Sequence, residues 1–155
     1  MEKIDSLNQV AEFHKTFNAP ILNTPQIPSK ERCELRVSLL QEELNELQEA
    51  IADKNIVEIA DALCDLQYVL SGAVLEFGLG EKFPALFNEV QRSNMSKACA
   101  NQQEADETIA FYKEKGEEAF SEISGEKINI HRKSDNKVLK NKYYSPADLK
   151  SILKN

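Results

Sequence analysis

The stretch that decides the fold is rich in both acids and apolar residues, and it runs over residues 41–77 as QEELNELQEAIADKNIVEIADALCDLQYVLSGAVLEF. It holds two acidic groups about a dozen residues apart, and these are Glu42, Glu43 and Glu46, then Glu58 and Asp61. Between residues 42 and 65 there are eight acids and one base, Lys54, so the local net charge of −7 equals that of the whole chain. The remaining 18 acids and 18 bases balance, so all the excess negative charge lies in this one segment.

Apolar residues recur at helical spacing along most of the first 100 residues, which predicts a mainly α-helical chain. Helices are expected over residues 5–18, 30–53, 56–77 and 83–97, with a short exposed helix over 104–115. Ser29 and Asn55 are suited to cap the second and third helices, and Gly78 and Gly80 should end the third. Three prolines between residues 19 and 28 exclude a helix there.

The second and third helices should pack on each other through apolar faces. At 100° per residue, one side of the second helix gathers Val37, Leu40, Leu44, Leu47 and Ile51. Glu43 lies at the edge of this stripe, so it should face a seam between helices. The third helix is apolar almost all round, which is typical of a central bundle helix. Glu58, Asp61 and Asp65 share one side of it, where an ionised carboxylate is costly unless it is paired or binds a metal.

Beyond residue 100 the pattern changes to the alternation of strands. Residues 119–123, 127–132 and 138–139 are expected to form a small β-meander. Residues 126–155 hold eight bases against three acids, which gives this end of the chain a basic character. We therefore divide the chain into a helical domain of residues 1–100 and an accessory helix and meander, residues 101–155, packed on the same domain.

The composition excludes several classes of function. A pI near 5.0 argues against binding to a nucleic-acid polymer, which requires basic surfaces. Cys33, Cys64 and Cys99 are odd in number and widely spaced, which indicates reduced thiols in a cytoplasmic protein and argues against a zinc site. The most apolar stretch, residues 56–77, contains three acids and is a poor membrane span, and the first ten residues have no apolar run of signal length.

Spacings of three and four residues put side chains on one face of a helix. Two acidic groups on neighbouring antiparallel helices would bring four or five carboxylates into a small volume, where they repel one another unless a hard cation lies among them. Mg²⁺, or Mn²⁺ in its place, suits such an all-oxygen site and leaves positions for water and a substrate phosphate. That combination is suited to the attack of water on a phosphoanhydride. Asn94 and Lys97 on the next helix could hold phosphate oxygens.

The two acidic groups together resemble the EExxE…ExxD signature of the all-α nucleoside triphosphate pyrophosphohydrolases. This superfamily includes MazG-like proteins, dimeric dUTPases and phosphoribosyl-ATP pyrophosphohydrolase. The resemblance covers about residues 5–100. Asn94-Met95-Ser96-Lys97 and the tail over residues 137–149 are similar to a bacterial and phage branch described as phosphoribosyl-ATP pyrophosphohydrolase-like. The resemblance implies a mainly α, MazG-like helical bundle completed by dimerisation, as a homodimer or a higher homo-oligomer. The C-terminal meander has no counterpart in the minimal family fold, and its basic surface could cover the active site or the dimer.

The resemblance also implies an activity, which is the Mg²⁺-dependent cleavage of a (d)NTP or related nucleotide to its monophosphate and pyrophosphate in a house-cleaning role. Glu43, Glu46, Glu58 and Asp61 would bind Mg²⁺. Glu42 would orient or deprotonate the attacking water, and Asp65 would support the metal ligands from one turn further along. Asn94 and Lys97 would contact the phosphates of the substrate.

Two other readings compete with this one. A non-catalytic helical dimer that binds a nucleotide or a protein would keep the fold and show no dependence on metal. A di-iron carboxylate bundle requires Glu-x-x-His pairs. The chain has none, because His14 and His131 both lie outside the acidic helices.

Overall fold

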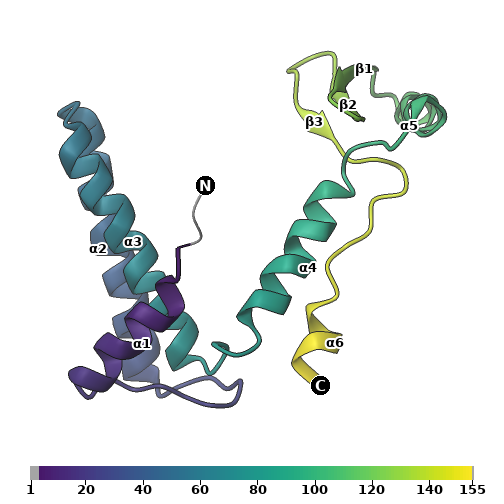
Figure 1. Ribbon diagram of the computed structural model, residues 1–155. Helices are drawn as coiled ribbons and strands as arrows, with labels where there is room; N and C mark the ends of the chain where they lie inside the picture. The colour runs from purple at the N-terminus through teal and green to yellow at the C-terminus, as the bar shows by residue number, and fades with distance from the viewer. Residues whose placement is uncertain (1–3, 155) are drawn as a thin grey trace. The chain divides into compact units, whose positions relative to one another are not determined.

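The chain folds into six helices and a small antiparallel sheet over residues 4–154, the part that the computed structural model describes (Figure 1). It divides into two compact units, an N-terminal unit of residues 4–83 and a C-terminal unit of residues 84–154. The mainly helical class with a C-terminal meander is confirmed. The boundary of the functional domain at residue 100 stays a prediction, and residues 1–3 and 155 of the two predicted domains lie outside the described residues.

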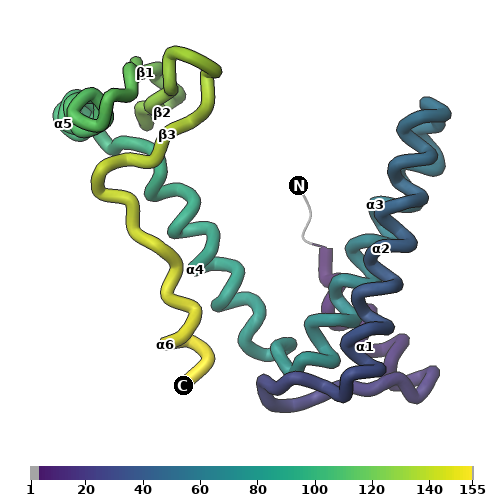
Figure 2. Tube along the Cα trace, turned by 180° about the vertical axis from the view of Figure 1, so that it is seen from behind, coloured from purple at the N-terminus to yellow at the C-terminus, as the bar shows by residue number. Residues whose placement is uncertain are grey.

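The N-terminal unit consists of three helices, α1 (Ser6–Thr16), α2 (Lys30–Ala52) and α3 (Ile56–Glu76). A three-residue connection makes α2 and α3 an antiparallel hairpin, and the two run side by side in Figures 1 and 2. The predicted caps are confirmed. The Ser29 hydroxyl accepts the backbone N–H of Arg32 at 3.4 Å, and the Asn55 side chain accepts those of Val57 and Glu58.

The end of α3 is a Schellman motif centred on Gly78, whose φ is +68°. The Gly78 N–H donates to the carbonyl of Leu75 at 3.1 Å, and the Leu79 N–H donates to the carbonyl of Val74 at 3.0 Å. A Cβ on Gly78 would lie 1.9 Å from the carbonyl oxygen of Thr24. The position therefore requires glycine both for its backbone conformation and for the space it leaves.

The proline-rich segment before α2 is tied to this same end of α3. The N–H of Leu22 donates to the carbonyl of Leu75 at 3.0 Å, and the N–H of Gln26 donates to that of Phe77 at 3.1 Å. The Leu75 carbonyl thereby accepts a further hydrogen bond besides that from Gly78, and the Phe77 carbonyl gains a partner that the end of a helix does not supply. The segment is thus an extended connection, as the prolines predict, and it is hydrogen-bonded to the C-terminal end of α3.

A buried ion pair joins α2 to α3. The Glu76 side chain is 1% exposed and accepts hydrogen bonds from both Arg32 and Arg36. Burial raises the pKa of Glu76, but the hydrogen bonds from the two guanidinium groups outweigh it and leave the pKa below the ordinary value. His14 of α1 joins the network, because its Nε2 lies 3.1 Å from Arg36 Nη2 and its Nδ1 lies 2.8 Å from the Pro20 carbonyl. All three helices are therefore fixed to one another at this point.

The apolar residues of α3, which predict a central bundle helix, are not all covered within one chain. Buried residues gather near its C-terminal end, whereas Ile56 is 73% exposed and Leu63 is 51% exposed. The predicted apolar stripe of α2 is likewise open, with Val37 68% exposed and Ile51 56% exposed. The physical reason is that only α1 and α2 pack on α3 within this unit, so the apolar residues at the far end of the hairpin have nothing to cover them.

The C-terminal unit contains α4 (Phe83–Met95), α5 (Gln102–Glu114), β1 (Ala119–Ser124), β2 (Lys127–Arg132), β3 (Val138–Leu139) and α6 (Leu149–Lys154), with α4 starting at its boundary. The strands pair in the order β1-β2-β3, all antiparallel, and α5 packs on β1 and β2. The small core between them consists of Cys99, Ala105, Ile128, Ile130 and Leu139. This unit therefore has a hydrophobic core of its own.

Cys33, Cys64 and Cys99 all carry free thiols. None of the helices formed by residues 4–154 is both long enough and apolar enough to cross a membrane.

The two glycines that end α3 and α5 form a matched pair for testing the close contact at Gly78. Gly116 closes α5 with the same hydrogen-bond pattern and a φ of +79°, but a Cβ there would meet open space. We expect Gly116→Ala to lower the free energy of unfolding by about 1 kcal/mol, the usual cost of a left-handed alanine. Gly78→Ala should cost roughly 1–3 kcal/mol more because it also overlaps Thr24. Urea unfolding of both variants measures the difference, and equal losses would contradict the close contact.

Candidate functional site

The acids singled out by the sequence lie on the α2–α3 hairpin, and the buried ion pair determines which of them meet. Glu43 lies eleven residues after Arg32 on α2, and Asp65 lies eleven residues before Glu76 on α3. Eleven residues at 100° each return to within about 20° of the starting direction. Because Arg32 and Glu76 face each other, Glu43 and Asp65 face the same seam three turns away.

The electrostatics of Glu43 agree with this register. Its side chain is half-buried, and its Oε2 atom is buried with no hydrogen-bond partner among the residues that the structure describes. Burial is the largest cause that raises the pKa of this carboxyl above its ordinary value. The negative charges that raise it further belong, in decreasing order, to Glu46, Asp65, Glu42 and Asp61. The prediction that Glu43 faces a helix seam is confirmed, and acids from both helices act on it.

The other predicted acids are more open to solvent. Glu42, Glu46 and Asp61 are exposed, and Asp65 is half-buried. Glu58 is exposed in the first turn of α3, where the helix dipole favours a negative charge. Within residues 4–154, no three His, Cys, Asp or Glu side chains are placed to hold one metal ion together. The assignment of Glu43, Glu46, Glu58 and Asp61 as metal ligands therefore stays a prediction.

The orphaned carboxylate oxygen of Glu43 and the all-carboxylate composition of its surroundings nevertheless suit a hard divalent cation. Mg²⁺ prefers oxygen ligands and commonly takes only one or two carboxylates from the protein, with water and phosphate oxygens in its other positions. Such an ion would also remove the repulsion among the five acids that act in this seam. The residues present thus fit the cation that the sequence predicted.

The two predicted phosphate-binding residues belong to the C-terminal unit and form a pair. Asn94 is in the last turn of α4, which ends at Met95 and not at the predicted residue 97, and Lys97 lies in the turn that follows. The Lys97 ammonium donates a hydrogen bond to the Asn94 side-chain oxygen at 2.8 Å. The structure also places Tyr144 and Lys140 beside them, which the sequence reasoning missed. The signals for these two were the positive charge of residues 126–155 and the similarity of the tail over residues 137–149 to the phosphoribosyl-ATP pyrophosphohydrolase-like branch.

Comparison with known proteins identifies the family. Residues 10–94 match the family model described as phosphoribosyl-ATP pyrophosphohydrolase, which is more than half of the chain and includes every predicted site residue except Lys97. The chain belongs to the phosphoribosyl-ATP pyrophosphohydrolase family. That family lies in the MazG-like all-α NTP pyrophosphohydrolase superfamily, so the resemblance stated from the acidic groups is confirmed. Membership indicates a pyrophosphohydrolase-type activity, that of a hydrolase acting on pyrophosphate bonds.

A viral protein resembles this family member along almost its whole length. The chain is 23% identical over 243 aligned positions to "Uncharacterized protein L479" of Acanthamoeba polyphaga mimivirus, and the alignment covers 98% of this chain and 97% of that protein. The likeness therefore extends through the C-terminal unit, beyond the part that the family model matches. The name of that protein assigns no activity.

The raised pKa of Glu43 predicts a specific pH dependence of stability. An acid whose pKa is higher in the folded state destabilises that state as the pH rises through the raised value, because the folded protein must then lose its more tightly held proton. Glu43→Gln removes this loss. We expect its free energy of unfolding to exceed that of the wild type by roughly 0.5 kcal/mol at pH 7.5, a modest figure because solvent screens the half-exposed seam, and to approach it at pH 4.

Urea unfolding in EDTA across this pH range measures the effect. The control is Glu49→Gln, which removes an exposed acid from the same helix and should leave the stability curve parallel to that of the wild type. A Glu43→Gln protein that is less stable than the wild type at pH 7.5 would contradict the electrostatic account of the seam.

Proposed function

We propose that the chain is a Mg²⁺-dependent nucleoside triphosphate pyrophosphohydrolase, which cleaves a (d)NTP or related nucleotide to the monophosphate and pyrophosphate. The observation that carries the proposal is the Glu43 carboxyl, whose buried oxygen has no hydrogen-bond partner among residues 4–154 and whose pKa is raised by four further acids from two helices. Ionised carboxylates in such a place require a compensating cation. Family membership supplies the reaction class, and a role in removing surplus or non-standard nucleotides is part of the proposal.

The acids of the seam would hold the metal. Glu43, Glu46, Glu58 and Asp61 would supply carboxylate oxygens to Mg²⁺, for which Mn²⁺ can substitute. Asp65, half-buried and acting on Glu43, would orient the ligands. The bound cation would offset phosphate charge and lower the pKa of a coordinated water.

The remaining residues would act on water and phosphate. Glu42 is exposed next to Glu43, so its carboxylate is accessible to a water molecule, from which it would take a proton as the new phosphorus–oxygen bond forms. The oxygen bridge between the α- and β-phosphorus atoms would be cleaved, and pyrophosphate would leave as the other product beside the monophosphate. Asn94 and Lys97 would donate hydrogen bonds to phosphate oxygens and balance the charge that develops on them.

We further propose that a second copy of the chain covers the open apolar face of the hairpin, which gives a homodimer or a higher homo-oligomer. The face is formed by exposed residues of α2 and of the N-terminal half of α3, namely Val37, Leu44, Ile51, Ile56, Val57 and Leu63. Large apolar side chains that are exposed in such number along two helices are unfavourable in water and indicate an interaction site. Neither a membrane nor a nucleic-acid polymer is proposed as a partner.

A non-catalytic helical dimer that binds a nucleotide or a protein is the second candidate. The observation that favours it is that, in the described part of the chain, no three potential ligands are placed around one metal position. The two candidates differ in one measurable respect, which is the dependence of any activity and of thermal stability on Mg²⁺.

The activity is tested by a pyrophosphate-release screen over the common NTPs and dNTPs, with dUTP, dITP and phosphoribosyl-ATP added, in Mg²⁺ and in EDTA. We expect release in Mg²⁺ alone. Glu43→Gln and Asp61→Asn should lower kcat/KM by roughly a hundredfold or more, because each removes a metal ligand. They should also abolish the rise in thermal stability that Mg²⁺ produces in the wild type.

The matched control for this experiment is Glu49→Gln, an exposed acid on the same helix that should retain both the activity and the response to Mg²⁺. A folded wild-type protein that releases no pyrophosphate from any of these nucleotides, and whose stability Mg²⁺ does not change, would leave the binding module as the better description.

The oligomer is tested by charging its apolar face. Val57→Glu and Leu63→Glu should convert a dimer into a monomer, because each would bury a carboxylate without a partner in the interface. Light scattering after size exclusion measures the mass. Ile123→Glu is the control, since Ile123 is 76% exposed but lies in β1 of the C-terminal unit and should leave the mass unchanged. A wild-type mass of one chain at micromolar concentration would rule out the proposed assembly.

A further inference from the structure

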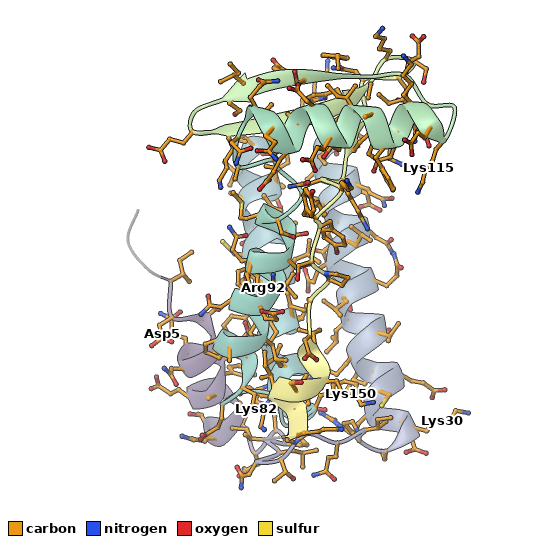
Figure 3. All side chains as sticks on the ribbon, turned by 90° about the vertical axis from the view of Figure 1, so that its right-hand side faces the viewer. Asp5, Lys30, Lys82, Arg92, Lys115 and Lys150 are labelled. Atoms are coloured by element: carbon orange, nitrogen blue, oxygen red, sulfur yellow. The ribbon has the colours of Figure 1, made fainter. Side chains whose placement is uncertain are left out.

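The C-terminal segment of residues 140–148 lies along the C-terminal end of α4, next to the predicted phosphate-binding pair. The N–H of Asn141 donates to the Lys97 carbonyl at 2.9 Å, and Arg92 Nη2 donates to the Pro146 carbonyl at 3.1 Å. In Figure 3, Arg92 is labelled on α4 with this segment running alongside the helix. Further hydrogen bonds from Ser145 to Ser96 and from Asp148 to Glu89 continue the attachment.

Asn141 fixes the path of this segment. Its side chain is 6% exposed, and its amide nitrogen donates to Glu104 Oε2 at 2.9 Å and to the Ala98 carbonyl at 3.3 Å. Its side-chain oxygen accepts from Thr108 Oγ1 at 3.2 Å and from the N–H of Tyr143 at 3.0 Å. Every hydrogen-bonding group of the amide is thus engaged, so the residues on either side of Asn141 are held in a defined position.

The segment brings a tyrosine and a second lysine to the end of α4. The Tyr144 hydroxyl accepts a hydrogen bond from the buried Ser93 Oγ at 3.2 Å, which leaves its own proton available to a ligand. The Lys140 ammonium lies 4.3 Å from the centre of the Tyr144 ring. The hydrogen bond from Ser93 lowers the pKa of Tyr144, and the positive charges of Lys140, Lys97 and Arg92 lower it further.

Of the three cations at this place, only Arg92 forms an ion pair in the described part of the chain. Arg92 is paired with Glu89 through two hydrogen bonds of 2.8 Å. Lys97 donates to a neutral amide and Lys140 lies over a ring, and among residues 4–154 neither of them forms an ion pair with a carboxylate. Two ammonium groups and one phenol therefore offer hydrogen-bond donors on one small surface without an anionic acceptor.

We infer that Lys97, Lys140 and Tyr144 together bind a phosphate group of the nucleotide, so that the C-terminal segment completes the phosphate site to which Asn94 and Lys97 belong. The inference rests on the proposed function, which supplies a polyphosphate as the ligand. The oxygens of a polyphosphate are charged acceptors, and hydrogen bonds between such oxygens and ammonium or phenol donors are among the stronger ones in proteins. The accessory tail is then part of the substrate site.

The same segment contains a matched pair that should not bind phosphate. Lys142 lies 5.3 Å from the centre of the Tyr143 ring, so a second lysine of the segment lies near a second tyrosine ring. Both of these side chains engage Glu107 of α5, with Lys142 Nζ at 3.5 Å and the Tyr143 hydroxyl donating to the carboxylate. Their donors are thus already neutralised, which makes this pair a control for composition and position in the chain.

The test measures the binding of inorganic tripolyphosphate to the full-length protein by calorimetry in EDTA. We expect Lys140→Met and Tyr144→Phe each to weaken binding by roughly tenfold, the usual effect of losing one charge-assisted hydrogen bond. Lys142→Met and Tyr143→Phe should change it less than twofold. Lys140→Arg should restore most of the affinity, and Tyr144→Phe keeps the ring on which Lys140 packs, so a loss of packing alone would not produce this pattern.

Several outcomes would overturn the inference. These are a wild-type protein that does not bind tripolyphosphate, variants of both pairs that bind as tightly as the wild type, and equal losses in both pairs. Nucleotide hydrolysis in Mg²⁺ tests the proposed function independently of tripolyphosphate binding. Selective loss of tripolyphosphate binding without any hydrolysis would uphold the phosphate site and reject the enzyme. Metal-dependent hydrolysis with unchanged kcat/KM in Lys140→Met and Tyr144→Phe would uphold the enzyme and reject the phosphate site.

Discussion

The N-terminal unit depends on the burial of Glu76 between two arginines. A carboxylate at this position is doubly unfavourable, since it is removed from water and lies at the C-terminal end of α3, where the helix dipole is also negative. Arg32 and Arg36, one turn apart on α2, both donate to it, and removing one partner of such a pair typically costs about 3–5 kcal/mol. Gly72 leaves the room, because a Cβ there would lie 2.6 Å from the Arg36 guanidinium. The hairpin is thereby held in one register.

That register decides what the opposite end of the seam can do. If α2 packed on α3 one residue out of register, Glu43 would point about 100° away from Asp65. The acids around it would then no longer lie together. With the ion pair in place, the same seam holds a fully paired carboxylate at one end and, three turns away, a carboxyl whose buried oxygen no described residue satisfies. A structural constraint at one end thus prepares a chemical site at the other.

The features that the sequence predicted well are those set by neighbours in the chain. Ser29 and Asn55 cap helices through their own side chains, Gly78 ends α3 through its own backbone, and the position of Glu43 at a seam follows from 100° per residue. The burial of Glu76 did not follow, because its partners lie 40 and 44 residues away and the charges resemble ordinary helix surface. The apolar character of α3 likewise indicates that something covers it, without indicating whether that surface belongs to the same chain.

The residues of the candidate site also fall into those that local sequence predicts and those that distant contacts place. Its acids were predictable from spacing, whereas the position of Tyr144 beside Lys97 depends on the contacts that Asn141 makes 33 to 43 residues away. A metal–polyphosphate ligand requires carboxylates for its cation and cationic donors for its oxygens. Within residues 4–154, neither the acids around Glu43 nor the ammonium groups of Lys97 and Lys140 form an ion pair, whereas Glu76 is paired with two arginines. Charged groups that a fold leaves unpaired lower its stability. A ligand of opposite charge that binds to them recovers this free energy, so the unpaired groups serve binding.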